Sequence, residues 1–268
     1  MKSIAVVTGG GHGIGRALCR RLAADDVKVV VVDIEGDAAE VVAREIGGTA
    51  KQVDVADEAA IERLVEDVEA EIGPIDLFIS NAGVAFGDGD SGSISKEGGL
   101  NPIEDRWDIS WNVNVMAQVF AARAVIPKML QRGGGHIINV ASAAGLLSQI
   151  GDAAYSTTKH ASVGFSESLA INYGDDGIKV SVVCPQAVAT RLIGMDDDSG
   201  ATEGGFGGNE LDGILKAEEV ADIIVEQAAE GRFMILTHPQ VTAYIQRKSG
   251  DYDRWIGGMR KFRRSLTK

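Results

Sequence analysis

Short runs of β-branched residues alternate along this chain with longer segments of helical pattern, such as 58–72 and 152–173. The runs show no inner polar–apolar alternation, which is typical of strands buried on both faces of a sheet. Strands that alternate with helices form βαβ units. The sequence therefore predicts an α/β fold over residues 1–268: a single doubly wound (Rossmann) domain whose parallel sheet of about seven strands is flanked by helices. The expected strands are Ile4–Val7, Val27–Val32, Thr49–Val53, Ile75–Ile79, His136–Val140, Val180–Val183 and Phe233–Leu236.

Composition narrows the class of protein. A net charge of −13 over 268 residues opposes binding to a phosphate backbone, so we expect no nucleic-acid partner. The two cysteines, Cys19 and Cys184, lie far apart in apolar stretches and indicate buried thiols in a reducing compartment. Uninterrupted apolar runs fall well short of a membrane span of about 18 residues, and the first is too short for a signal peptide. We therefore expect a cytoplasmic protein with no membrane partner.

The turn after the first expected strand is rich in glycine: residues 8–15 read Thr-Gly-Gly-Gly-His-Gly-Ile-Gly. Glycine allows a positive φ and a close approach of the backbone to a ligand. The N–H groups that open the following helix, together with the helix dipole, favour a bound pyrophosphate. The spacing is T-G-x-x-x-G-x-G rather than G-x-G-x-x-G, so a tight turn without a ligand remains an alternative.

Asp33 ends the second expected strand, 20 residues after Gly13. An acid at this place hydrogen-bonds the adenosine ribose of NAD, and its charge disfavours the 2′-phosphate of NADP. Ile34 follows, so the next residue offers no cation to reverse that preference. The alternative is a strand-end Asp that only caps the next turn.

Tyr155 and Lys159 are four residues apart in a helical stretch and so share one face. A nearby ammonium favours the phenolate and is expected to lower the pKa of the tyrosine, which suits proton exchange with an alcohol or a carbonyl. Ser142 lies just after the strand at 136–140, at the carboxyl end where ligands of such sheets bind. Taken alone, Tyr155 and Lys159 are equally well a surface pair.

Taken together, these residues resemble the short-chain dehydrogenase/reductase family. The resemblance covers residues 8–185 in the order and spacing of the family. It rests on the glycine-rich turn, Asp54, Asn81-Ala82-Gly83, Asn114, Ser142, Tyr155-x-x-x-Lys159 and Pro185.

The resemblance implies a role for each matching position. Ser142 would polarise the substrate oxygen, Tyr155 would be the general acid or base, and Lys159 would bind the nicotinamide ribose. Asn114 would hold a water that links Lys159 to solvent. The cofactor NAD would contact Gly9, Gly11, His12, Gly13, Ile14, Gly15, Asp33, Ile34, Asp54, Val55, Asn81, Ala82, Gly83, Tyr155, Lys159, Pro185, Val188 and Thr190.

The expected substrate pocket is mostly apolar, which favours a hydrophobic or cyclic secondary alcohol over a sugar. Gln186 stands where the family usually has glycine, which places a side chain near the nicotinamide. The four histidines are scattered without the spacing of metal ligands, so we expect no metal. By position, the candidate pocket residues are Ala144, Leu146, Gln149, Gln186, Leu192 and Ile193.

The resulting hypothesis is an oxidoreductase that transfers a hydride between NAD(H) and a secondary alcohol or ketone. Alternatives are an NAD-binding regulator without strong catalysis, an NADP-dependent carbonyl reductase, and an epimerase or dehydratase of the same architecture. The chain ends too soon for the longer C-terminal domain of the last class. The family implies a homotetramer, or else a homodimer, with the helices at about 105–131 and 155–173 at the larger interface.

Two further segments carry expectations. Residues 186–215 include the glycine-rich, acidic stretch 194–213 and are predicted to form a mobile loop over the substrate. Residues 240–268 are predicted to form a basic amphipathic extension whose apolar stripe docks on protein and roofs the pocket. A membrane surface or a solvated tail remains an alternative. The stripe consists of Tyr252, Trp255, Met259, Phe262 and Leu266.

Overall fold

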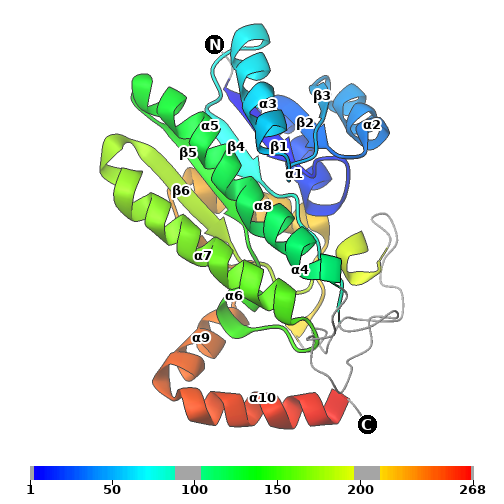
Figure 1. The fold of residues 1–268 in the computed structure, drawn as a ribbon, viewed down its shortest axis with the longest axis vertical. Coiled ribbons are helices and arrows are strands. Elements are labelled where there is room, and N and C mark those ends of the chain that lie inside the picture. Colours follow the sequence, from blue (N-terminus) through cyan, green and yellow to red (C-terminus); the bar gives the residue numbers. More distant parts are fainter. Residues whose placement is uncertain (1–2, 88–103, 196–211, 267–268) are drawn as a thin grey trace.

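A parallel sheet of seven strands runs through the molecule in the order β3-β2-β1-β4-β5-β6-β7 (Figure 1). The computed structural model describes residues 3–87, 104–195 and 212–266. The predicted fold class is confirmed. The strands are β1 (Ile4–Thr8), β2 (Lys28–Asp33), β3 (Thr49–Gln52), β4 (Leu77–Ser80), β5 (Gly135–Val140), β6 (Ile178–Val183) and β7 (Met234–Ile235).

Strand bounds differ from the predicted ones by one or two residues, most at the starts of β4 and β6. Ile75 precedes β4 because its N–H donates to Glu69 Oε1 at 2.9 Å, outside the ladder between strands. At the sheet edge, β7 keeps only two residues, which pair with Val182 and Val183 of β6. The expected elements are therefore present, with shifted ends.

Helices cover both faces of the sheet (Figure 1). Within β1, Ala5 and Val7 pack with the α1, α2 and α8 side, whereas Ile4 and Val6 pack with α3 and α5. Because both faces of the strands are buried, apolar residues follow one another without alternation. The helices are α1 (Gly13–Ala24), α2 (Gly36–Ile46), α3 (Glu58–Glu71), α4 (Glu104–Trp111), α5 (Ala117–Gln131), α6 (Ala144–Leu147), α7 (Ala153–Tyr173), α8 (Ala217–Ala229), α9 (Gln240–Gly250) and α10 (Tyr252–Leu266), with shorter turns η1 (Asn112–Met116), η2 (Gly174–Asp176) and η3 (Arg191–Ile193).

The helical segment Arg106–Gln131, which runs through α4, η1 and α5, is long and apolar enough by composition to cross a membrane. Its most apolar window is 56% buried inside the molecule, as in a core helix of a globular protein. The sequence shows no uninterrupted apolar run over this segment, because Arg123 and Lys128 lie within it.

The C-terminal extension forms two helices at one end of the molecule (Figure 1). Val241 of α9 is fully buried beside Leu147 of α6, and the rings of Tyr244 and Trp255 lie 6.5 Å apart. Trp255, Met259, Phe262 and Leu266 are half-buried, but Tyr252 is 59% exposed. The extension thus packs on its own chain through α9, and one residue of the predicted stripe faces solvent.

The glycine-rich, acidic stretch 194–213 of the predicted loop falls largely outside the described residues. The mobile loop over 186–215 therefore stays a prediction.

Candidate active site

A cavity of about 590 Å³ opens at the carboxyl ends of the central strands. This is the crevice where doubly wound sheets bind ligands, beside the point at which the strand order reverses between β1 and β4. Its size lies within the range of small-molecule sites. The glycine-rich turn forms one part of its wall, and the residues around Ser142 and Tyr155 form another.

The glycine-rich turn leads into α1, whose N-terminus has no side-chain cap. Gly9 and Gly13 have φ of +64° and +49°, values that favour glycine. The N-cap of α1, His12, makes no side-chain cap, and the first turn contains no acid. Its free N–H groups and the helix dipole therefore face the cavity without an anionic partner from α1 itself.

Two glycines of the turn serve packing instead. Gly9, His12, Gly13 and Ile14 line the cavity, but the predicted cofactor contacts Gly11 and Gly15 are not part of its wall. A Cβ on Gly15 would lie 2.0 Å from Gly9 O, and one on Gly11 would lie 2.8 Å from Ala38 Cβ. These two positions need glycine so that α1 and α2 can approach the turn closely.

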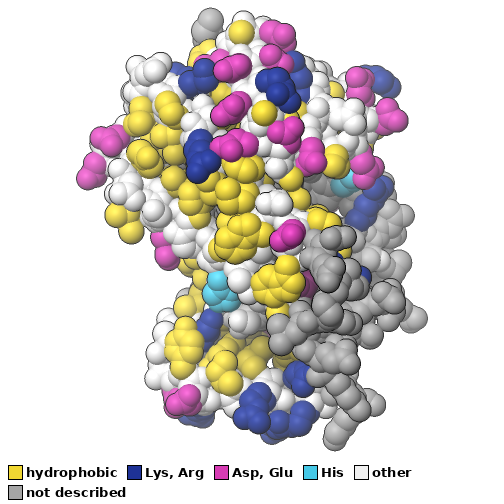
Figure 2. Space-filling model, in the orientation of Figure 1, with side chains coloured by type: hydrophobic (Ala, Val, Ile, Leu, Met, Phe, Trp, Pro, Cys, Tyr) yellow, Lys and Arg dark blue, Asp and Glu magenta, His cyan; other side chains and the backbone are white. Residues whose placement is uncertain are grey.

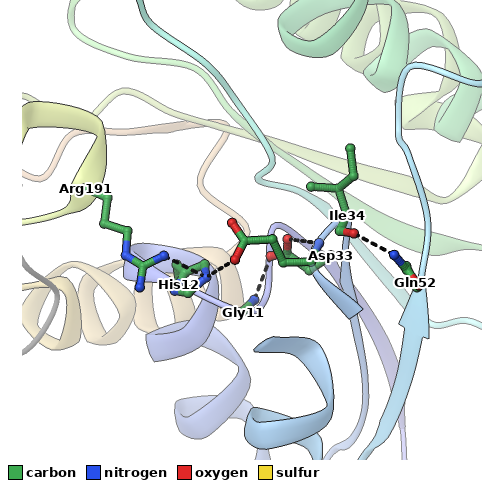
Figure 3. A network of polar contacts seen from close by, with 7 residues as sticks. Gly11, His12, Asp33, Ile34, Gln52 and Arg191 are labelled. Carbon is green, nitrogen blue, oxygen red and sulfur yellow. Dashed lines mark hydrogen bonds and ion pairs between the residues drawn. The ribbon is translucent and has the colours of Figure 1, made fainter. Parts of the chain in front are cut away.

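Asp33 lines the cavity at the end of β2 with its carboxylate held by the backbone. Oδ2 accepts from Gly11 N–H at 2.9 Å, and Oδ1 accepts from Glu35 N–H at 3.0 Å (Figure 3). Asp33 therefore caps the next turn, the alternative that the sequence left open, and it also lines the cavity. Beside it, Ile34 is 60% exposed and forms an apolar rim.

Asn81 and Thr8 join the ends of β1 and β4. Asn81 Nδ2 donates to Thr8 O at 3.0 Å and to Gly9 O at 3.3 Å. Thr8 Oγ1 accepts from the N–H groups of Asn81 and Ala82. These bonds fix the glycine-rich turn against the strand beside it. The other predicted cofactor contacts that line the cavity are Asp54, Val55, Asn81, Ala82, Gly83, Pro185, Val188 and Thr190.

Ser142, Tyr155 and Lys159 come together on the cavity wall. Tyr155 and Lys159 lie one turn apart on α7, with Lys159 Nζ 5.5 Å from the centre of the tyrosine ring. Lys159 Nζ donates to Val140 O at 3.0 Å, which ties the ammonium to the end of β5. A surface pair is thereby excluded, because Lys159 is only 3% exposed.

Burial controls the acidity of both groups. The pKa of Tyr155 is raised to about 12, chiefly by burial and also by the charge of Asp152, against the opposing effect of the hydrogen bond with Ser142. Burial lowers the pKa of Lys159 to about 8. The expectation that Lys159 lowers the pKa of Tyr155 is not met in the protein alone, because burial of the phenol is the stronger effect.

Asn114 lies on η1, a π-helical turn between α4 and α5. Its Oδ1 accepts from Val84 N–H at 2.9 Å, and its Nδ2 donates to Val84 O and to Thr158 Oγ1. Asn114 is fully buried and is not part of the cavity wall. A Cβ on Gly83 would meet both Asn114 Oδ1 and Lys159 Nζ, at 3.2 and 3.3 Å, so the two groups are close. Asn114 therefore fixes the chain around Lys159.

Asp152 is a site residue that sequence reasoning missed. Its Oδ1 accepts from Tyr155 N–H at 2.8 Å and caps α7, and its Oδ2 accepts from the N–H groups of Phe86 and Gly87. Asp152 is 6% exposed and joins the segment after β4 to the helix that carries Tyr155. The signal in the sequence was an Asp three residues before the tyrosine, the spacing of an N-cap.

Five of the six predicted substrate residues line the cavity: Ala144, Gln149, Gln186, Leu192 and Ile193. The sixth, Leu146, is not part of the cavity wall. It packs instead with Leu236 and the α9 side, and the next residue of the short helix α6, Leu147, faces the cavity. Within the described residues, α9 and α10 contribute nothing to the wall, so the predicted roof from the C-terminal stripe is not found.

Gln186 is held by the C-terminal part of the chain. Its Nε2 donates to Asp212 Oδ2 at 2.9 Å, and Tyr244 OH of α9 donates to Asp212 Oδ1 at 2.9 Å. Since a carboxylate only accepts, the amide nitrogen of Gln186 is fixed toward Asp212. The side chain at this unusual position is therefore part of the wall with a fixed orientation.

Comparisons with known proteins agree with this geometry. The model of the short chain dehydrogenase family matches residues 3–199. The 1-deoxy-11-beta-hydroxypentalenate dehydrogenase of Streptomyces exfoliatus is 33% identical over 259 residues, which cover 94% of this chain and 89% of the relative. The meso-2,3-butanediol dehydrogenase of Serratia marcescens is 32% identical, with 70% and 72% covered.

Among solved structures, a short chain dehydrogenase/reductase from Burkholderia phymatum in complex with NAD superposes with a TM-score of 0.80. It is 28% identical, and the match covers 94% of each chain. The chain belongs to the short-chain dehydrogenase/reductase family and is an oxidoreductase related to dehydrogenases of secondary alcohols.

Proposed function

We propose that this protein is an NAD(H)-dependent oxidoreductase that interconverts a hydrophobic or cyclic secondary alcohol and its ketone. The observation that carries the proposal is the arrangement of one cavity. Its one end holds Ser142, Tyr155 and Lys159, and its other end holds the uncapped N-terminus of α1. A dinucleotide has an anionic middle and a reactive end that match these two parts. When bound, the nicotinamide ring donates or accepts the hydride.

The side chains would share the remaining chemistry. Tyr155 would give a proton to the ketone oxygen or take it from the alcohol, and a pKa of about 12 in the protein alone suits the donor role. The Ser142 hydroxyl, which interacts with Tyr155, would orient the same oxygen. Lys159, held by Val140 O, would bind a ribose hydroxyl and favour the phenolate as it forms.

The preference for NAD rests on acidic side chains at the adenosine end. Asp33, Glu35 and Asp54 all line this part of the cavity and would repel a 2′-phosphate. NAD in the Burkholderia phymatum relative supports the same choice.

NADP dependence is the second candidate, because one observation favours it. Arg191 and His12 lie next to Glu35 at the rim, and neither is its neighbour in sequence. A guanidinium there offers a partner to a 2′-phosphate that the sequence did not reveal.

The substrate class follows from the walls near Tyr155. Val84, Phe86, Ala144 and Leu147 are apolar, with Leu192 beyond them. The named relatives act on 1-deoxy-11-beta-hydroxypentalenate, on meso-2,3-butanediol and, in Mycolicibacterium smegmatis, on D-threitol. The apolar wall favours a substrate closer to the first than to the polyols.

The test is a steady-state comparison of NAD and NADP in a screen across alcohol classes with purified protein. The proposal predicts NADH production from hydrophobic or cyclic alcohols. It also predicts a kcat/KM for NAD at least about tenfold that for NADP, since one repulsive contact costs more than about 1.4 kcal/mol. Equal kcat/KM values would refute the NAD assignment, and activity confined to polyols would refute the substrate class.

We further propose a cytoplasmic homotetramer or homodimer whose larger interface lies on α4, α5 and α7. Hydrophobic side chains gather over α5 and α7 in Figure 2. Ile109 and Trp111 of α4 are 42% and 41% exposed, and Ile171 of α7 is 81% exposed. Large exposed apolar patches mark association surfaces. An NAD-binding regulator remains the alternative if purified protein binds NADH without turnover.

A further inference from the structure

Three segments far apart in sequence meet at the rim of the cavity. Arg191 opens η3, His12 is the N-cap of α1, and Glu35 follows β2. Arg191 Nη1 lies 3.1 Å from His12 Nε2 (Figure 3). His12 Nε2 in turn lies 3.4 Å from Glu35 Oε2. The guanidinium is thereby placed beside the helix N-terminus, although 179 residues separate it from His12.

The charge of the cavity wall makes this arginine distinctive. Four acids line the described wall: Asp33, Glu35, Asp54 and Asp152. Its cationic side chains, within the described residues, are Lys159 and Arg191. Lys159 is buried at the reacting end and bound to Val140 O. An anion at the α1 end therefore depends on the helix dipole and on Arg191 for its positive surroundings.

We propose that Arg191 binds the diphosphate of the dinucleotide, and that His12 Nε2, as an acceptor, and the nearby negative charge of Glu35 hold the guanidinium at the rim until the diphosphate binds. This inference rests on the proposed function. The planar guanidinium offers paired donors that match phosphate oxygens, and a diphosphate carries more charge than the single carboxylate of Glu35.

The placement of Arg191 also connects the cofactor to the substrate. Arg191, Leu192 and Ile193 form the single turn η3, and Leu192 and Ile193 line the cavity beyond Thr190. A diphosphate that fixes Arg191 therefore also fixes the positions of Leu192 and Ile193 in the cavity wall. Arg191 is thus a cofactor-binding residue that positions part of the substrate wall.

The test measures binding of cofactor fragments by calorimetry, which is independent of turnover. The probes are ADP-ribose, which contains the diphosphate, adenosine, which has no phosphate, and adenosine 2′-monophosphate. The variants are Arg191→Gln and Arg191→Lys, with Arg44→Gln as the control. Arg44 is a 78% exposed arginine of α2 that pairs with Glu40.

For Arg191→Gln we expect the Kd of ADP-ribose to rise about 10- to 100-fold, the range of a charge-assisted hydrogen bond. The Kd of adenosine should stay within about twofold. Arg191→Lys keeps the charge without the paired donors, so its Kd for ADP-ribose should lie between those of the wild type and Arg191→Gln. Arg44→Gln should leave all three ligands unchanged, and the thermal midpoint of each variant reports its folding.

A fourth variant tests the competition. Glu35→Gln should tighten ADP-ribose binding, because the carboxylate beside His12 no longer attracts the guanidinium to its place at the rim. Weaker ADP-ribose binding by this variant would contradict the proposal.

The outcomes separate this inference from the proposed function. If wild-type protein fails to bind ADP-ribose, the proposed function itself is wrong. If the wild type binds it and folded Arg191→Gln binds equally well, only the inference is overturned. A loss confined to adenosine 2′-monophosphate would assign Arg191 to a 2′-phosphate and also overturn it.

Discussion

At the scale of single residues, burial determines what the titratable side chains do. It acts in the same sense on Tyr155, Lys159 and His136, and in each case it disfavours the charged form. The sequence identified Tyr155 and Lys159 by their spacing. It could not reveal that burial dominates their pKa values, because the packing of α7 against β5 is a tertiary property. The missed Asp152 and Arg191 act through contacts with distant segments, which local spacing does not encode.

His136 makes this effect measurable as stability. It lies on β5 with Nε2 3.0 Å from Ser181 Oγ, and burial lowers its pKa from 6.5 to about 4. The unfolded chain therefore binds more protons between pH 6.5 and 4, so stability falls as pH falls through this window. We expect His136 to account for a loss of roughly 1–2 kcal/mol between pH 7 and pH 5.

Urea unfolding at pH 7 and pH 5 tests the expectation for His136. His136→Gln should show a smaller loss on acidification than the wild type. His160→Gln, at an exposed position of α7, should show the wild-type loss. An equal loss in the wild type and His136→Gln would contradict the role of His136.

At the scale of elements, the glycine-rich turn combines two requirements. The sequence predicted its glycines as cofactor contacts, and the structure divides them: Gly9 and Gly13 line the cavity, whereas Gly11 and Gly15 permit close packing. The motif shows where glycine stands. Which neighbour approaches each glycine depends on how α1, α2 and β4 assemble. The same reasoning explains Leu146, since a helix as short as α6 turns adjacent residues toward different neighbours.

Alanine substitutions test the packing role of Gly15. A Cβ there would lie 2.0 Å from Gly9 O and 2.5 Å from Asn81 Nδ2, so Gly15→Ala should destabilise the protein by about 2–4 kcal/mol. Gly257, inside α10, has no neighbour within 4 Å of an added Cβ. Gly257→Ala should stabilise by about 0.5–1 kcal/mol through helix propensity. Denaturant unfolding measures both, and a neutral Gly15→Ala would disprove the close packing.

At the scale of the whole molecule, charge and apolar surface are unevenly distributed. Residues 247–268 contain eight Lys or Arg against two Asp, a net +6, which leaves −19 for residues 1–246. Basic side chains lie along α10 and acidic ones gather at the opposite end, with apolar side chains between them (Figure 2). The sequence predicted the sheet and its layers, because the period of each element reports its burial. It predicted the contacts of the extension less well, since an amphipathic stripe does not specify its partner.

The apolar face of α7 leads to a prediction about assembly. Ile171→Glu places a charge in the proposed interface, where burial without a partner is costly, and should shift the protein to a smaller species. Light scattering coupled to gel filtration measures the mass. Val41→Glu is the matched control, since Val41 is 60% exposed on α2, away from α7, and should leave the mass unchanged. An unchanged mass for Ile171→Glu would place the interface elsewhere.

The transfer of deuterium from a secondary alcohol, deuterated at its carbinol carbon, to NAD tests the central claim most directly. The alcohol is taken from the most active class in the screen, and the label in NADH is followed by mass spectrometry for wild type, Tyr155→Phe and Tyr252→Phe. Tyr252 is 59% exposed on α10, is not part of the cavity wall and serves as the control. The account predicts deuterated NADH from the wild type and from Tyr252→Phe. For Tyr155→Phe it predicts transfer slower by about 10²- to 10⁴-fold, the range of general acid–base catalysis, with an NADH Kd within about threefold of the wild type. Transfer by Tyr155→Phe within tenfold of the wild type, or a wild type that binds NADH but transfers no deuterium, would contradict it.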